Sequence, residues 1–127
     1  MRGLTCQGVG MVRIGSIVLK VSDGERAAGF WGSALGYAPA PGNPLFLVDP
    51  RGSGARLHVD EDDRTHLDLW VADEAEQQAE VARLVALGAT RVDWAYPEDA
   101  DFVVLADPDG NLFCVVNAGP AAGESAA

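Results

Sequence analysis

The sequence has few of the features that mark several large classes of protein. Two cysteines in 127 residues are too few for a disulfide framework, which favours a reducing compartment. Nine basic residues stand against 19 acidic ones, for a net charge of −10, and this excludes the basic stripe that nucleic acid or an anionic membrane surface requires. No apolar run reaches the ~18 residues that span a bilayer. We therefore expect a cytoplasmic protein that binds neither nucleic acid nor membrane.

Familiar catalytic motifs are also missing. The glycines at Gly8 and Gly10 are not followed by a helical pattern, so they do not form a phosphate-binding loop, and no nucleophile elbow is present. The first dozen residues lack the apolar core of a signal peptide. The length and the 48% hydrophobic content predict one domain with its own core. We expect this domain at 13–117, between a flexible N-terminal extension (1–12) and a flexible tail (118–127).

What the sequence does contain is an internal repeat. Asp49-Pro-Arg-Gly52 and Asp107-Pro-Asp-Gly110 follow one turn pattern, in which Pro presets φ and Gly accepts a positive φ. The residues 13–60 and 64–117 each predict a strand, a helix and then two or three strands. Such a repeat predicts an α+β fold of two βαβββ modules, which form a curved mixed sheet around a central cavity.

Local patterns place the elements of each module. The first helix follows a Ser22-x-x-Glu25 capping box and ends at Gly36, and the second begins at Asp73 and ends at Gly88. The strands are expected at 14–21, 45–48, 56–59, 65–71, 91–94, 102–105 and 112–116, with a proline-rich bend at 38–44. Helical spacing predicts the buried residues of the two helices. These are Ala27, Phe30, Trp31, Ala34 and Leu35 in the first, and Ala75, Ala79, Ala82, Val85 and Ala86, widened by Val81 and Leu84, in the second.

The segments that carry the repeat resemble the vicinal-oxygen-chelate superfamily of glyoxalases, bleomycin-resistance proteins and extradiol dioxygenases. Leu105–Cys114 resembles its closing hairpin, and Ile14–Asp23 with Phe30-Trp31 and Leu35-Gly-Tyr37 resembles its opening strand and helix. Thr65–Val71 with Val81–Ala89 resembles its second module. The resemblance covers roughly Val12 to Asn117. It implies paired modules around a cavity and, since exposed sheet edges pair readily, a homodimer.

In the enzymes of this superfamily the resemblance also implies a divalent metal, held by one inward residue on the first and last strand of each module. Those positions are Ser16, His58, His66 and Cys114 in this sequence. Serine is a weak ligand, and Cys114 stands where a glutamate would hold the metal and move a proton, so the usual isomerase chemistry loses its base. Metal ligands His58, His66 and Cys114 suit zinc better than magnesium or manganese.

Strand alternation predicts which side chains face the cavity. Ile17, Leu19 and Val21 are expected to pack on the first helix, which turns their neighbours inward. The expected cavity residues are Ser16, Lys20, Arg56, His58, His66, Asp68, Trp70 and Cys114. An ordinary wall histidine, a buried thiol and a structural ion pair are the simpler interpretations of the same residues.

Three functions fit this pattern. The first is a protein that binds a small aromatic or anionic organic molecule in the cavity, without the standard metal centre. The second is a metal-dependent lyase, isomerase or dioxygenase that uses His58 and His66. The third is a structural or regulatory module whose cavity has degenerated. The first function is favoured because the four metal-ligand positions lack a carboxylate, while the inward face is still lined by polar and aromatic residues. No catalytic residue is assigned.

Overall fold

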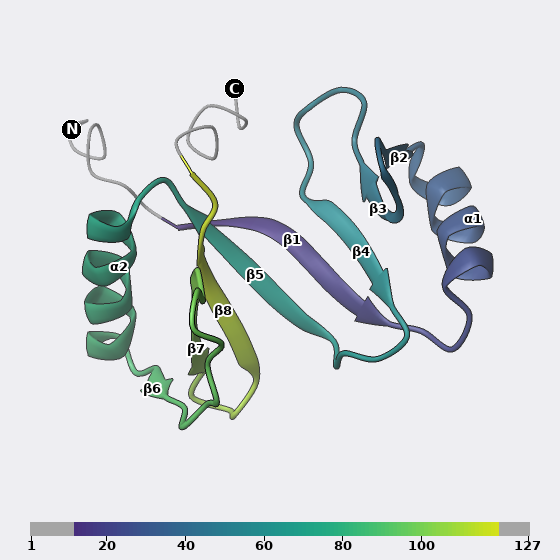
Figure 1. Ribbon diagram of the computed structural model, residues 1–127. Helices are drawn as coiled ribbons and strands as arrows, with labels where there is room; N and C mark the ends of the chain where they lie inside the picture. Colours follow the sequence, from purple (N-terminus) through teal and green to yellow (C-terminus); the bar gives the residue numbers. More distant parts are fainter. Residues whose placement is uncertain (1–11, 120–127) are drawn as a thin grey trace. The chain divides into compact units, whose positions relative to one another are not determined.

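The order of helices and strands repeats once along the chain. The computed structural model describes residues 12–119, so the predicted tail (118–127) and N-terminal extension (1–12) lie almost wholly outside the described residues. The first half consists of β1 (Arg13–Lys20), α1 (Gly24–Leu35), β2 (Ala38–Ala40), β3 (Asn43–Val48) and β4 (Arg56–Asp60). The second half consists of β5 (His66–Val71), α2 (Glu74–Ala86), β6 (Thr90–Arg91), β7 (Phe102–Ala106) and β8 (Leu112–Asn117) (Figure 1). The two predicted βαβββ modules are therefore confirmed.

The strands belong to one mixed sheet. Their order is β2-β3-β4-β1-β5-β8-β7-β6, so β2 and β6 stand at its two ends and the sheet is open. β1 runs parallel to β4, while β2–β3, β3–β4, β6–β7 and β7–β8 are antiparallel. This confirms the α+β fold class with a mixed sheet.

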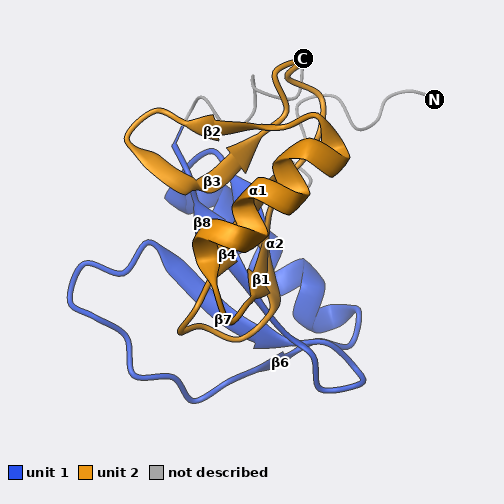
Figure 2. Cartoon of the chain, turned by 90° about the vertical axis from the view of Figure 1, so that its right-hand side faces the viewer, with its two compact units in different colours: residues 1–13, 69–124 blue, residues 14–68, 125–127 orange. Residues whose placement is uncertain are grey.

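The described residues divide into two compact units (Figure 2). Unit 2 contains residues 14–68, which include most of β1, all of α1, β2, β3 and β4, and the first half of β5. Unit 1 contains residues 12–13 and 69–119, which include the second half of β5 and everything after it. Each unit has its own helix and its own hydrophobic core.

The core of unit 2 lies between α1 and the sheet. Leu47, Leu57 and Val59 are buried at its centre, and Leu19 and Val21 pack against them. The predicted helix-facing side of β1 is thus confirmed at its C-terminal end. Ile17, expected on the same side, is 36% exposed, because α1 packs mainly against β3 and β4.

Three α1 residues that were expected to be buried, Phe30, Ala34 and Leu35, are exposed, and the expected N-cap was also wrong. Phe30 is 63% exposed and only meets the edge of the Trp31 ring, at 5.0 Å between centroids. The N-cap is Asp23 and not Ser22, because the Asp23 carboxylate accepts the hydrogen bond from the Arg26 amide (3.1 Å). The Ser22 hydroxyl accepts instead from the Arg26 guanidinium (3.0 Å).

The buried face of α2 also differs from the predicted alanine stripe. Val81 is buried as expected, but the other buried residues are Gln77 and Glu80, and Ala75, Ala79, Ala82, Val85 and Ala86 are exposed. The Gln77 amide donates to the Asp101 and Val115 carbonyls (3.0 and 2.9 Å). Glu80 pairs with Arg83 (2.8 Å) and accepts from the Val12 amide (3.0 Å). Polar side chains can be buried when their hydrogen bonds are all made. The hydrophobic periodicity of a helix gives no information about those hydrogen-bond partners.

The turns follow the predicted pattern, whereas two short strands do not. In both turns a carboxylate caps the backbone: Asp49 accepts from the Arg51 amide (2.9 Å) and Asp107 from the Asn111 amide (2.8 Å). The bend at 38–44 forms the additional edge strand β2, where a proline is tolerated because edge strands leave amides unpaired. The strand expected at 91–94 is limited to Thr90–Arg91. No described helix is long and apolar enough to cross a membrane.

Candidate functional site

One face of the sheet in unit 2 carries four of the eight predicted site residues. β4 pairs with β1 in the register Ser16–Arg56, Val18–His58 and Lys20–Asp60, and residues paired in this way point to the same side of a sheet. The alternate residues of β4 are in the core beneath α1. The side chains of Ser16, Lys20, Arg56 and His58 therefore lie on the face away from α1, as alternation predicts.

An aromatic residue that sequence reasoning missed lies on this face. Phe46 on β3 pairs with His58 on β4, and the two rings are stacked with centroids 3.9 Å apart and planes 18° apart. The same alternation along β3 predicts this position, because Leu47 is in the core and its neighbour must face the other way. The pair forms a flat apolar surface beside the polar residues.

The Asp60 carboxylate lies beside Nε2 of the His58 ring. Its Oδ2 lies 3.5 Å from His58 Nε2, while its Oδ1 accepts from the amides of Asp63 and Asp62 (2.9 and 2.8 Å). These two backbone hydrogen bonds are the main reason that the pKa of Asp60 is lowered, and His58 and Lys20 lower it further. Asp60 is therefore a carboxylate at neutral pH and offers His58 a fixed acceptor.

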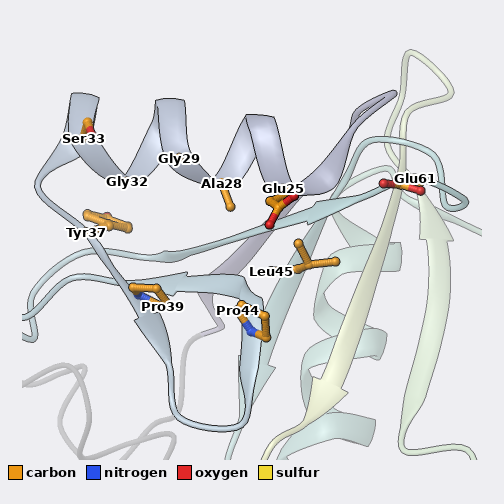
Figure 3. Close-up of a pocket in the computed structure, with 10 residues that line it drawn as sticks. All are labelled: Glu25, Ala28, Gly29, Gly32, Ser33, Tyr37, Pro39, Pro44, Leu45 and Glu61. Atoms are coloured by element: carbon orange, nitrogen blue, oxygen red, sulfur yellow. The ribbon is translucent and has the colours of Figure 1, made fainter.

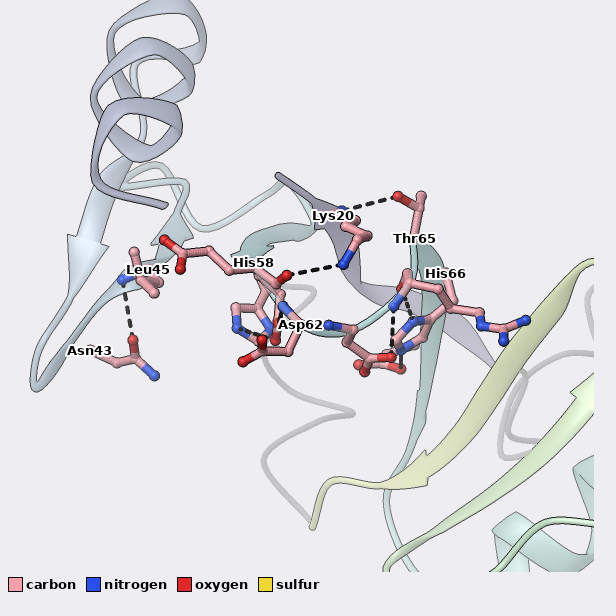
Figure 4. A network of polar contacts seen from close by, with 12 residues as sticks. Lys20, Asn43, Leu45, His58, Asp62, Thr65 and His66 are labelled. Atoms are coloured by element: carbon pink, nitrogen blue, oxygen red, sulfur yellow. Dashed lines mark hydrogen bonds and ion pairs between the residues drawn. The ribbon is translucent and has the colours of Figure 1, made fainter. Parts of the chain in front are cut away.

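Lys20 ties the connecting loop to the end of β1. Its amide donates to the Thr65 hydroxyl (3.0 Å) and its ammonium to the Glu61 carbonyl (3.0 Å) (Figure 4). These bonds fix the start of β5, where His66 follows directly. The loop between the two modules therefore also helps to position the site residues at the start of β5.

His66 has an acceptor at each ring nitrogen. Nδ1 lies 2.7 Å from the Arg64 carbonyl, which can only accept, so Nδ1 carries the proton. Nε2 lies 3.2 Å from Oδ1 of Asp68, and the two side chains are only 11% and 24% exposed. With the proton on Nδ1, Nε2 of the neutral ring is an electron-pair donor that lies close to a carboxylate oxygen.

The remaining predicted residues are divided between the units. Ser16 is 3% exposed, and its hydroxyl has no hydrogen-bond partner among residues 12–119. In unit 1, the Trp70 ring lies 5.8 Å from the Arg13 guanidinium carbon. Cys114 lies on β8 opposite Val104, and its neighbour Val115 is in the core beneath α2. Six of the eight predicted residues are therefore in unit 2, and Trp70 and Cys114 are in unit 1.

The family model described as "Glyoxalase-like domain" matches residues 16–116, most of the chain. This chain belongs to the glyoxalase-like domain family. The match runs from Ser16 on β1 to Val116 on β8 and so includes both modules. A comparison with curated proteins found no match.

This glyoxalase-like protein is similar to several solved structures. It is similar to a chain described as an NAD-dependent benzaldehyde dehydrogenase from Legionella pneumophila, with 16% identity, 80% of this chain and 96% of that chain covered, and a TM-score of 0.58. It is also similar to a glyoxalase-related enzyme from Fulvimarina pelagi (27% identity, 82% and 86% covered, TM-score 0.37). A glyoxalase/bleomycin resistance protein from Albidiferax ferrireducens T118 matches with 21% identity, 80% and 94% covered, and a TM-score of 0.36.

Three of the four positions that the resemblance assigns to the metal, Ser16, His58 and His66, lie in unit 2. Of these three residues, only His66 has a second ligand atom beside it at a distance that suits a divalent cation. Nitrogen and oxygen ligands about 2.1 Å from a metal stand about 3.0–3.4 Å apart, and His66 Nε2 and Asp68 Oδ1 are 3.2 Å apart. His58 is stacked on Phe46 and faces Asp60. Within this unit, Asp68 supplies a carboxylate that the four predicted positions themselves lack.

Proposed function

We propose that this glyoxalase-like protein binds a small planar aromatic acid on the polar face of unit 2 and does not need a metal to do so. The stacked Phe46–His58 pair carries the proposal. Aromatic rings prefer offset or edge contacts with other rings at 4.5–7 Å, and each such contact contributes about 0.5–1.5 kcal/mol beyond the buried area. A flat ligand ring can make that contact with a surface that two strands already hold in place.

Arg56 supports the acidic group in the proposed ligand. It lies two residues before His58 on the same strand and on the same face, which is a separation of roughly 7 Å along the strand. A carboxylate on a ring that contacts His58 is therefore within reach of the guanidinium, which binds carboxylates through two parallel hydrogen bonds.

A four-compound panel tests both parts of the proposal. Binding of 1-naphthoate, benzoate, cyclohexanecarboxylate and 2-naphthol is followed by ligand-observed NMR with chelator-treated protein. We expect 1-naphthoate to bind best, cyclohexanecarboxylate to lose the stacking and 2-naphthol to lose the carboxylate contact. Phe46→Leu should weaken 1-naphthoate by about two- to thirteenfold, from the 0.5–1.5 kcal/mol of one ring contact.

Matched controls separate this face from the rest of unit 2. Phe30→Leu changes an exposed phenylalanine on α1, and Arg26→Gln changes an arginine of the same helix, so neither should affect binding. Arg56→Gln should weaken the two aromatic acids and leave 2-naphthol unchanged. Equal binding of all four compounds, or none by any, would refute the proposal, and the second result would favour a structural or regulatory module.

A metal-dependent activity is a second candidate, supported by the pairing of His66 with Asp68. A ligating histidine commonly donates its other ring nitrogen to a backbone carbonyl, as Nδ1 does to Arg64. His66 and Asp68 would hold the cation. A bound divalent cation would polarise an oxygen of the bound molecule. The mixed nitrogen and oxygen donors suit zinc and its neighbours better than magnesium.

Metal analysis distinguishes the two candidates. Protein prepared without chelator is assayed for zinc, nickel, iron and manganese alongside His66→Ala, Asp68→Asn and His58→Ala. Near-stoichiometric metal that is lost in His66→Ala and Asp68→Asn but retained in His58→Ala would establish the metal site on which the second candidate depends. Cys114→Ser then shows whether the thiol takes part. Aromatic-acid binding that is unchanged by chelator would support the first.

A further inference from the structure

A groove lies on the other side of unit 2, between α1 and the β2–β3 hairpin (Figure 3). Its volume is about 680 Å³, within the 300–1,000 Å³ that ligand sites commonly have. The groove belongs to the α1 side of the sheet, whereas the proposed aromatic-acid site is on the opposite face. It therefore does not form part of the site described above.

Small residues on one face of α1 leave the groove open. Ala28, Gly29, Gly32 and Ser33 form one wall, opposite the apolar residues Pro39, Pro44 and Leu45 (Figure 3). A Cβ built at Gly29 would meet no atom within 4 Å. The helix thus has room for a larger side chain there, and the empty volume is a consequence of the residues at 28–33.

The two charged residues of the groove are both acidic and lie toward one end. Glu25 and Glu61 lie near Leu45, while Tyr37 and Pro39 lie at the other end (Figure 3). The Glu61 carboxylate is fixed because its Oε2 accepts from the Gly24 amide (2.8 Å). The Tyr37 hydroxyl donates to the Ala55 carbonyl (2.8 Å). None of the residues that line the groove is basic.

We propose that this groove binds a small organic cation with an apolar body. The two carboxylates attract the cationic group, and the body lies along the wall of Gly29 and Gly32 against the two prolines. Charge complementarity favours this ligand class over an organic anion, because an anion would have no basic partner among the lining residues and would approach a chain with a net charge of −10.

Amide NMR with benzyltrimethylammonium as the probe tests the proposal. Glycine amides resolve well, so we expect saturable shifts at Gly29 and Gly32, weaker shifts with neutral benzyl alcohol and none with benzenesulfonate. Glu25→Gln should weaken binding of the cation about fivefold, the effect of one ion pair near 4 Å in water-like surroundings. Glu74→Gln, which changes a glutamate in the first turn of α2, is the matched control.

Filling the groove provides an independent test. Gly29→Met places a side chain into the open volume and should abolish binding, whereas Ala34→Met, an exposed α1 residue that does not line the groove, should not affect it. The amide spectrum of each variant reports its folding. Binding that survives Gly29→Met in a folded protein, binding of the sulfonate as strong as that of the cation, or absence of saturable shifts would overturn the proposal.

Discussion

The buried amide of Gln77 is expected to be a major support for β8, the strand that carries Cys114. Gln77 is 7% exposed, and its Nε2 donates to the carbonyls of Asp101 (3.0 Å) and Val115 (2.9 Å). The change Gln77→Leu removes both hydrogen bonds and replaces the amide with a shorter apolar side chain of similar volume. The effect on stability therefore reports mainly the two bonds, because most of the packing of α2 is kept.

The expected loss of stability is about 2 kcal/mol. Each hydrogen bond contributes about 1 kcal/mol net, and a buried carbonyl left without a partner costs about 1–3 kcal/mol. The Asp101 carbonyl keeps a second donor, the Asn117 amide (2.8 Å), so the total should lie near the middle of this range. With an m-value of about 2 kcal/mol/M, the urea midpoint falls by about 1 M.

Urea unfolding followed by tryptophan fluorescence measures this change. Gln78→Leu is the matched control, because Gln78 is the adjacent residue of α2 and is exposed. Surface changes cost at most ~0.5 kcal/mol, so the urea midpoint of this variant should stay within about 0.3 M of wild type. A Gln77→Leu midpoint no lower than that of Gln78→Leu would refute the view that these two bonds stabilise unit 1.

Three shorter predictions concern other positions. The hydrogen bond from Arg83 lowers the pKa of Glu80 below its ordinary value of 4.5. The pair therefore stabilises the fold above pH 4.5 and loses this effect as the pH falls below that value. Between pH 3 and 6, the urea midpoint of Glu80→Gln should depend less on pH than that of wild type. Gly110→Ala should destabilise by about 1–2 kcal/mol, since φ is 88° and a Cβ is costly in that conformation. Gly29→Ala should stabilise by up to about 1 kcal/mol, and thermal unfolding measures both changes. Val59→Ala, at 0% exposure, should cost about 2–3 kcal/mol in the same assay.

The sequence predicted the fold well because the signals that define it are local and repeated. Turn chemistry at Asp49 and Asp107 uses side chains that bond their own backbone, so the four-residue pattern is sufficient to identify each turn. Comparison of the two turns then locates the two modules. Alternation along β1 and β4 assigned Leu19, His58 and their neighbours to the correct faces in unit 2, because a buried face fixes strand register.

The errors occur where burial depends on partners far along the chain. Gln77 is buried because carbonyls on β8 and at Asp101 accept its hydrogen bonds, and no pattern within α2 contains that information. The exposed alanines of the same helix have no strong preference for either face. Phe46 was missed for a different reason: its partner His58 is defined only once β3 and β4 are in register.

The two proposed sites use neighbouring residues of one strand and should nevertheless act independently. Leu45 lines the groove, while Phe46, next in β3, stacks on His58 on the opposite face. The core of unit 2 lies between α1 and the sheet, and well-packed cores do not transmit small changes unless they have two arrangements. Phe46→Leu should therefore weaken 1-naphthoate without affecting benzyltrimethylammonium, and Gly29→Met should do the reverse. If either variant weakened both ligands in a folded protein, the two sites would be coupled through β3, and the sheet would have to exist in two states that each ligand selects.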